Sequence, residues 1–387
     1  MKKERVSKIT CIAASSLRSS ILSALEDSGL RDTFVQRGKQ VSLADRAGMF
    51  RLVPRVELED SAADIYRFYA PPDRAEEICA RISDFAGLAL PGRGSLFVEP
   101  AEIVRGASVG AAPPDPESGE EPGSGKGTLS DRLRLPSGLQ DYTALTCIVQ
   151  RGQGDALART VLEMGLCVPV VTYGQGMGLR NKLGLLRITI PVDKEVIYFL
   201  VPAADGPLAE NIAVHKARLD RPGQGFIYRC RVRAAAVNTR MSRSRRRHVA
   251  SMEQVILSVD SLQGSTDWRR ITAPSRGRGG QIDEGPALAC LSVICDEGRA
   301  GDFVRAAMEA GAGGATLMRL GYRDLPGAAA EHRGRSPSHA RETCDLIVPA
   351  DLIDDILEAL ADRGLFEPEV YGLVEITKVE KAVTYRG

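Results

Sequence analysis

The chain has 387 residues, of which 43% are hydrophobic and 26% are charged. This length exceeds that of an ordinary single core, so we expect two or three domains. The 51 Lys and Arg residues balance the 50 Asp and Glu residues, which excludes a global positive field that would attract nucleic acid or an anionic membrane. The longest apolar run, residues 196–204, is far shorter than the roughly 20 residues that a membrane helix needs. The N-terminal apolar stretch is too short for a signal peptide, and we expect a cytoplasmic protein without membrane insertion.

Motifs that would indicate catalysis or metal binding are missing from the sequence. The eight cysteines and four histidines show no zinc-ligand spacing, and neither a credible Walker A loop nor a nucleophile elbow occurs. We therefore expect reduced, mostly buried cysteines, and we predict no metal site, no cofactor and no catalytic residue. The chain is predicted not to be an enzyme.

The first predicted module spans residues 1–105. It starts with a strand and a helix that ends at Gly29, because glycine readily takes the left-handed conformation past a helix end. A second apolar strand ends at Pro71, and a further strand follows Gly94. The predicted strands and first helix occupy residues 9–13, 17–28, 65–70 and 96–98.

A linker at residues 106–141 separates the first and second modules. It is rich in Pro, Gly, Ser and Glu and cannot build a core, so we expect it to be disordered. The second module, residues 142–233, repeats the element order of the first. Its run Val196–Val201 is apolar at every position, which indicates that both faces of this strand are buried.

A second linker, residues 234–286, carries five arginines within Arg240–Arg247 and a short helical pattern. The arginine cluster has no interleaved aromatic residues, so a solvated or partner-docking segment is favoured over nucleic-acid binding. The third module spans residues 287–387. Its last helix carries an apolar stripe at residues 352, 353, 356, 357 and 360.

One spacing recurs in all three modules. The proline that ends a strand and the glycine that precedes the last strand are 23 residues apart, at Pro71 and Gly94, Pro202 and Gly225, and Pro349 and Gly372. Matching strand patterns flank each pair, which indicates three diverged copies of one unit. The element order predicts an α+β fold of three tandem ferredoxin-like (βαββαβ) modules, packed as a pseudo-trimer in which the bare sheets cover one another. We therefore expect a monomer.

Glycine-rich loops carry a resemblance to a known family. Residues 172–178 read TYGQGMG, residues 221–228 read RPGQGFIY, and residues 91–100 read PGRGSLFVEP. With the repeated unit, these motifs resemble the nitrogen-regulatory P-II (PII-like) signal transduction proteins. The resemblance implies nucleotide-binding clefts between modules, built from a loop base and a second glycine-rich turn. A lysine usually follows that turn in the family, whereas this chain has Ser95, Phe226 or Leu373.

The same loops supply the candidate site residues. Glycines let successive backbone N–H groups converge on an anion. Module three keeps only Gly321 and Gly372, so we expect its cleft to be degenerate. The expected effector-binding residues are Gly174, Gln175, Gly176, Gly178, Arg180, Lys182, Gly223, Gln224, Gly225, Arg229, Gly92, Arg93 and Gly94.

We expect a regulatory sensor in nitrogen or carbon metabolism. It would bind a small anionic effector, an adenine nucleotide such as ATP, ADP or AMP, between modules and regulate a target enzyme or membrane transporter. The two glycine loops of module two favour this hypothesis. The missing lysine favours the alternative, an effector-free scaffold that binds a partner protein, and an enzyme is the third alternative.

Overall fold

The computed structural model describes residues 1–30, 32–47, 54–88, 90, 93–106, 142–163, 167–177, 192–237, 286–324 and 340–384. Most of both predicted linkers, including Arg240–Arg247, lies outside these residues. No helix within the described ranges is long and apolar enough to cross a membrane.

Three stretches of the chain each follow the order strand, helix, strand, strand, helix, strand. The first contains β1 (Glu4–Ala14), α1 (Arg18–Asp27), β2 (Asp32–Ala47), β3 (Pro54–Ala70), α2 (Ala75–Ala86) and β4 (Gly94–Arg105). The second contains β5 (Tyr142–Gln150), α4 (Gly154–Glu163), β6 (Val170–Met177), β7 (Asp193–Pro202), α5 (Gly206–Ala217) and β8 (Gly225–Val232), followed by the short strand β9 (Ala234–Ala236). The third contains β10 (Leu288–Asp296), α8 (Ala300–Glu309), β11 (Ala315–Asp324), β12 (Ala340–Pro349), α9 (Ile353–Asp362) and β13 (Leu373–Thr384).

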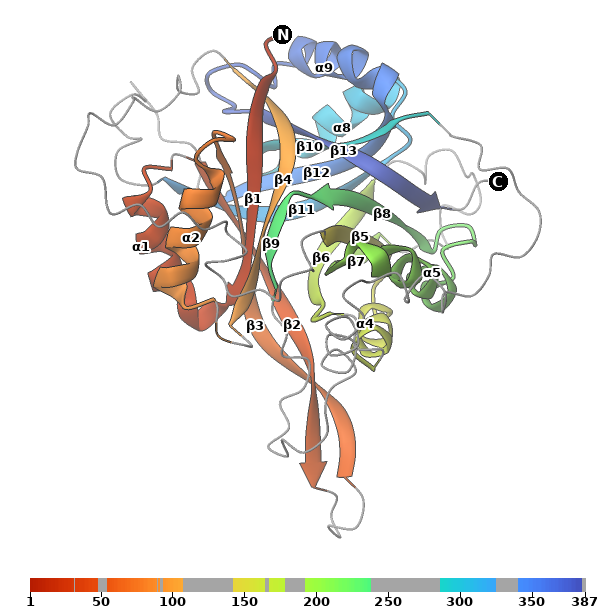
Figure 1. The fold of residues 1–387 in the computed structure, drawn as a ribbon. Helices are drawn as coiled ribbons and strands as arrows, with labels where there is room; N and C mark the ends of the chain where they lie inside the picture. The colour runs from red at the N-terminus through yellow and green to blue at the C-terminus, as the bar shows by residue number, and fades with distance from the viewer. Residues whose placement is uncertain are drawn as a thin grey trace.

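All these strands belong to one antiparallel sheet. Their order is β11-β12-β10-β13-β8-β5-β7-β6-β2-β3-β1-β4-β9, and the further pairings β11–β6, β11–β2 and β13–β4 close the sheet into a barrel (Figure 1). The predicted fold of three ferredoxin-like modules packed as a pseudo-trimer is therefore wrong. Within each stretch the strands pair with one another, and the two strands at the edges of that set also hydrogen-bond to strands of another stretch, as β13 does to β8 and β4. An unpaired edge would leave backbone N–H and C=O groups unsatisfied.

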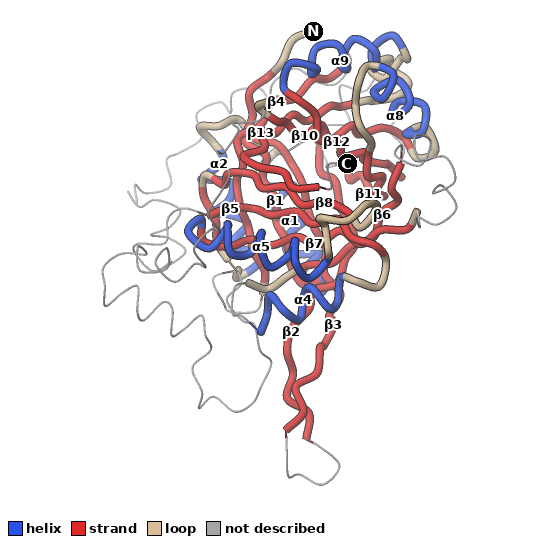
Figure 2. Tube along the Cα trace, turned by 90° about the vertical axis from the view of Figure 1, so that its right-hand side faces the viewer, coloured by secondary structure: helices blue, strands red, loops and turns tan. Residues whose placement is uncertain are grey.

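The helices lie in pairs on the outside of this barrel, α1 with α2, α4 with α5 and α8 with α9 (Figures 1 and 2). Strand alternation turns one set of side chains toward the helices and the other set inward. In β7, Ile197, Phe199 and Val201 pack into the core beneath α4 and α5, while Val196 and Leu200 belong to clusters between stretches. This confirms the prediction that both faces of residues 196–201 are buried.

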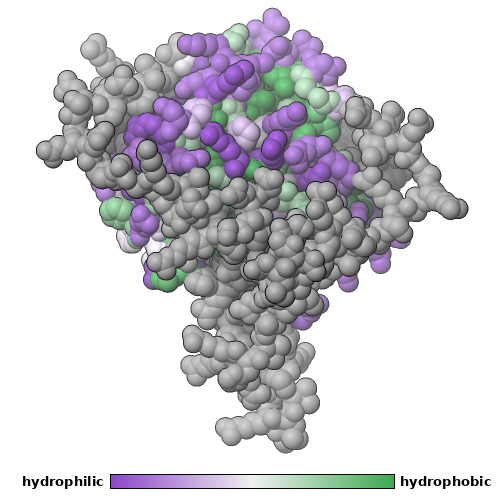
Figure 3. Space-filling view, viewed as in Figure 1, coloured by the Kyte–Doolittle hydropathy of each residue, from purple (hydrophilic) through white to green (hydrophobic). Residues whose placement is uncertain are grey.

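Two further features are visible from outside. The long strands β2 and β3 continue past the barrel as a two-stranded arm (Figures 1 and 2). On the face drawn in Figure 3, hydrophilic side chains surround smaller apolar areas among the described residues.

An acidic residue lies seven positions before each strand-ending proline. In the second and third stretches, this residue accepts a hydrogen bond from a backbone amide at the start of the first helix. Glu195 Oε2 accepts a hydrogen bond from the Gly154 amide at 2.6 Å, at the start of α4. Glu342 Oε2 accepts one from the Gly298 amide at 2.9 Å, just before α8. A carboxylate at a helix start satisfies free N–H groups and complements the helix dipole, so this position has a structural role in the second and third stretches.

The glycine of the recurrent 23-residue spacing also has a packing role. A Cβ atom at Gly94 would overlap the Ile12 carbonyl oxygen, and one at Gly225 would overlap the Ile148 carbonyl oxygen. Gly225 in addition has a φ of 137°, which other residues rarely adopt. Close backbone approach where the last strand begins therefore explains the repeated glycine without a ligand.

We expect the change Gly225→Ala to lower the free energy of unfolding by about 3 kcal/mol, because it combines backbone strain with this overlap. Gly321→Ala is the matched control, since its Cβ would lie 3.6 Å from the nearest atom, the Val35 carbonyl oxygen, and should cost less than about 1 kcal/mol. Urea unfolding of both variants measures the difference. Equal destabilisation would contradict the packing role.

Candidate functional site

A cavity lined by both polar and apolar side chains lies inside the barrel, where strands of all three stretches meet. Its lining includes β1, β3, β4, β5, β7, β8, β10, β12 and β13, and it has room for water-sized molecules. Alternation along β1 directs Lys8, Thr10 and Ile12 to the cavity, whereas Ile9 and Cys11 pack toward the helices.

Corresponding positions of the three stretches meet at this cavity. Arg67, Tyr198 and Asp345 each lie four residues before the strand-ending proline, and all three line the cavity. Their partners across the strand pairs β1–β3, β5–β7 and β10–β12 also line it, as a ring of hydroxyl groups from Thr10, Thr146 and Ser292. The three copies of this position thus place a cation, a phenol and an acid at the same cavity.

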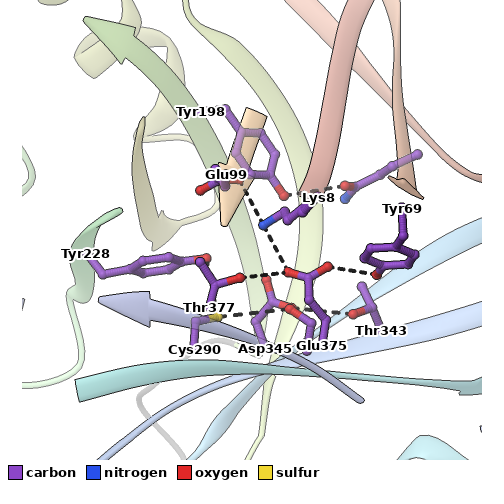
Figure 4. Close-up of polar contacts among 12 residues, drawn as sticks. Lys8, Tyr69, Glu99, Tyr198, Tyr228, Cys290, Thr343, Asp345, Glu375 and Thr377 are labelled. Carbon is purple, nitrogen blue, oxygen red and sulfur yellow. Dashed lines mark hydrogen bonds and ion pairs between the residues drawn. The ribbon is translucent and has the colours of Figure 1, made fainter. Parts of the chain in front are cut away.

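Lys8 holds the first and third stretches together at this site. Its Nζ lies 3.0 Å from Glu99 Oε2 and 2.9 Å from Glu375 Oε1, and both carboxylates are almost fully buried (Figure 4). Glu375 also accepts hydrogen bonds from the Tyr69 hydroxyl at 2.8 Å and the Thr377 hydroxyl at 3.2 Å. Lys8 and Glu375 are therefore satisfied by protein groups alone.

These contacts move the pKa values of both groups away from neutrality. Burial opposes the charged form of Lys8, but Glu375 and Glu99 outweigh it and raise the pKa of the ammonium group. Burial likewise opposes ionisation of Glu375, yet Lys8 and Arg67 lower its pKa to about 2. Both groups remain charged at neutral pH.

Arg67 contrasts with this satisfied pair. Its side chain is 8% exposed, and its Nε and Nη1 atoms are buried without a hydrogen-bond partner among the described residues. Glu375 and Asp345 attract the guanidinium group and raise its pKa although burial opposes its charge. A buried donor without an acceptor costs roughly 1–3 kcal/mol, so Arg67 marks a place where an acceptor from outside the chain would be stabilising.

Asp345 is the acid at the corresponding position of β12. Its Oδ1 accepts a hydrogen bond from the Thr343 hydroxyl at 3.4 Å, and Ser292 donates a further one. Burial raises the pKa of Asp345, and the attraction of Arg67 and the Ser292 hydrogen bond offset only part of that rise. Among the described residues, no Lys or Arg forms an ion pair with Asp345 as Lys8 does with Glu375.

Other polar groups near the cavity hydrogen-bond to one another. The Tyr198 hydroxyl lies 3.4 Å from Gln36 Oε1, and Gln36 Nε2 donates to the Thr172 hydroxyl at 2.6 Å. Cys290 Sγ lies 3.8 Å from the Tyr228 hydroxyl (Figure 4), and burial raises the pKa of both groups. A thiol with a raised pKa is a poor nucleophile. Among the described residues, no group of His, Cys, Asp and Glu could hold a metal ion.

The structure separates the two glycine loops predicted in module two. Gly174, Gln175 and Gly176 lie on β6, whereas Gly223, Gln224 and Gly225 lie where β8 begins. Strands β5 and β7 stand between β6 and β8, which places the loops roughly 14 Å apart at one end of the sheet. A Cβ atom at Gly174 would come within 2.8 Å of the Leu317 carbonyl oxygen, so packing against β11 explains this glycine too.

The other predicted site residues have protein partners or lie outside the described part of the chain. Arg229 forms ion pairs with Glu380 at 3.3 Å and Glu210 at 3.9 Å. Arg93 donates to the Ala86 carbonyl oxygen at 3.0 Å and so caps α2, next to Gly94 at the start of β4. Outside the described residues are Gly92, Gly178, Arg180 and Lys182.

The sequence contains a pattern that could have identified the cavity: charged residues at strand positions expected to be buried. Arg67 and Asp345 are charged residues within apolar strand segments, at the same distance before the recurrent proline. Lys8 and Thr10 similarly alternate with the apolar residues of β1. A charged residue at a buried alternation position is costly unless it is paired or functional, and comparison of the three copies identifies these positions.

Comparisons with known proteins identify neither a family nor a function for this chain. No family model and no curated protein matches the chain. A crystal structure of aspartate kinase from Synechocystis is 9% identical with a TM-score of 0.18, and the match covers 96% of this chain and 44% of that chain. An anthrone oxidase-like protein is 12% identical with a TM-score of 0.17, covering 61% and 94% respectively. The chain thus spans less than half of the aspartate kinase chain, and similarity at this level does not establish a shared fold.

The lowered pKa of Glu375 makes a prediction about acid stability. Because the native pKa of about 2 lies below the unfolded value near 4.5, this carboxylate stabilises the fold above about pH 5 and loses that contribution as the pH falls toward 2. The change Glu375→Gln should cost about 3 kcal/mol near pH 6 and progressively less below pH 5. Urea unfolding of both proteins across this range measures the difference. A cost that is independent of pH would show that Glu375 is not ionised in the native protein.

Proposed function

We propose that this protein is a non-catalytic regulatory sensor that holds the anionic group of a small effector molecule in the barrel cavity. The observation that carries the proposal is Arg67, a residue of the cavity lining whose Nε and Nη1 atoms are buried without hydrogen-bond partners among the described residues. A guanidinium group stays charged inside a protein and donates well to carboxylate oxygens. An effector that accepts hydrogen bonds from both nitrogens would remove the cost of their burial.

Binding is favoured over catalysis by the ionisation behaviour of the cavity. A general acid or base works best with a pKa near the operating pH. The pKa of Lys8 is raised and that of Glu375 is lowered, and burial raises the pKa values of Cys290, Tyr198 and Tyr228. These five shifts move their groups away from neutrality, which suits a fixed electrostatic environment for a ligand, whereas burial raises the pKa of Asp345 toward neutrality.

The effector that we propose for this cavity is a small molecule with one anionic group. The adenine nucleotide suggested by the family resemblance remains a prediction for the glycine loops of residues 172–178 and 221–228.

Regulation follows from where the cavity lies. Its lining comes from all three stretches, so an occupant contacts each of them at once. A ligand that binds only this closed arrangement stabilises it by mass action, which would alter the surface offered to a target enzyme or transporter. A cytoplasmic location is part of the same proposal, supported by eight cysteines that are all free and buried.

The test is thermal unfolding with sodium acetate or sodium formate against sodium chloride at equal ionic strength. We expect acetate or formate to raise the Tm of the unaltered protein, by an amount equivalent to about 2.7 kcal/mol at a hundredfold excess over Kd. Arg67→Met should abolish this rise, because it removes the donors while keeping an apolar stem of similar length. Arg319→Met, at an arginine whose side chain is 83% exposed, should retain it.

The outcomes separate the alternatives. An equal rise in the Arg67→Met variant would show that the anions act elsewhere on the protein. No rise in any variant would contradict an anion-binding cavity and favour the effector-free scaffold.

A further inference from the structure

We infer that the molecule bound in the cavity is a small zwitterion of the α-amino acid class, with its carboxylate at Arg67 and its ammonium group at Asp345. This inference rests on the proposed function and adds to it the chemical class of the effector. It depends on the contrast between two residues at corresponding positions, a cation on β3 and an acid on β12.

The first step is that, among the described residues, neither Arg67 nor Asp345 has a close ion-pair partner. Arg67 has two buried nitrogens without a hydrogen-bond acceptor among the described residues. Asp345 is 4% exposed and is contacted by the hydroxyl groups of Thr343 and Ser292, which cannot neutralise a carboxylate. The two residues attract each other, and among the described hydrogen bonds none joins them directly. The cavity therefore presents a donor site and an acceptor site of opposite charge.

The second step concerns the charge balance around the cavity. Among the residues that line the cavity, Lys8 and Arg67 are basic and Glu99 and Asp345 are acidic, so the two kinds are equal in number. A simple anion would add an uncompensated negative charge to this buried environment, where unbalanced charge is costly. A zwitterion adds no net charge and offers an ammonium group to Asp345.

The third step is the asymmetry of the lining. The third corresponding position is Tyr198, which is uncharged, so the three corresponding positions present one cation and one acid to the cavity. Such a polarity matches a ligand whose two ends carry opposite charges. Glycine is the smallest ligand of this kind.

Glycine and propionate provide a matched pair of probes. They have the same carboxylate and nearly the same shape, but glycine carries an ammonium group where propionate carries a methyl group. In isothermal titration calorimetry with the unaltered protein, we expect glycine to bind at least about tenfold more tightly than propionate. Asp345→Asn should remove this preference while propionate still binds, and Arg67→Met should abolish binding of both. Arg319→Met is the control and should bind as the unaltered protein does.

The possible failures are distinguishable. If propionate binds as tightly as glycine and its binding requires Arg67, the zwitterion inference is wrong and the anion-binding function stands. If neither glycine nor propionate binds, the zwitterion inference and the anion-binding function are both wrong. If Asp345→Asn keeps the preference for glycine, another group recognises the ammonium. If the Asp345→Asn variant does not fold, the relative affinities of the unaltered protein for glycine and propionate still test the inference.

Discussion

The ion pairs of Lys8 with Glu99 and Glu375 are the interaction on which the interior of the barrel depends. Three charged groups are buried there, and each would be strongly destabilising alone. Lys8 and Glu99 belong to the first stretch and Glu375 to the third, so the pairing is satisfied only when β1, β4 and β13 are together. Charge neutralisation thus requires the closed arrangement of strands and favours one register over others.

The cavity shows what one chain with three copies of a unit can achieve. Three identical chains around an axis would place the same residue at each corresponding position. Here the copies have diverged, and the positions four residues before the prolines carry Arg67, Tyr198 and Asp345. A site with unlike walls can recognise a ligand with unlike ends, which is the physical basis for the proposed effector class.

The glycine motifs have two possible physical explanations. Glycine permits both an anion nest and close backbone approach, and the two are indistinguishable in a sequence. In the structure, Gly94 and Gly225 are required by neighbouring carbonyl oxygens, and Gly174 lies against Leu317 of β11. Arg229, predicted to bind an effector, is instead paired with Glu380 and Glu210. Each of these partners is distant in the sequence.

The sequence by itself determined the local elements of this protein. Alternation and helical periodicity located strands such as β7 and helices such as α8 and α9, and the recurrent proline and glycine revealed three copies of one element order. Only the tertiary structure decided how the copies join, because hydrogen bonding between strand edges such as β13 and β8 depends on backbone groups that every residue carries. It also decided the site. Lys8, Arg67 and Asp345 are far apart along the chain, and only the closed sheet brings them to one cavity and pairs Lys8 with Glu375.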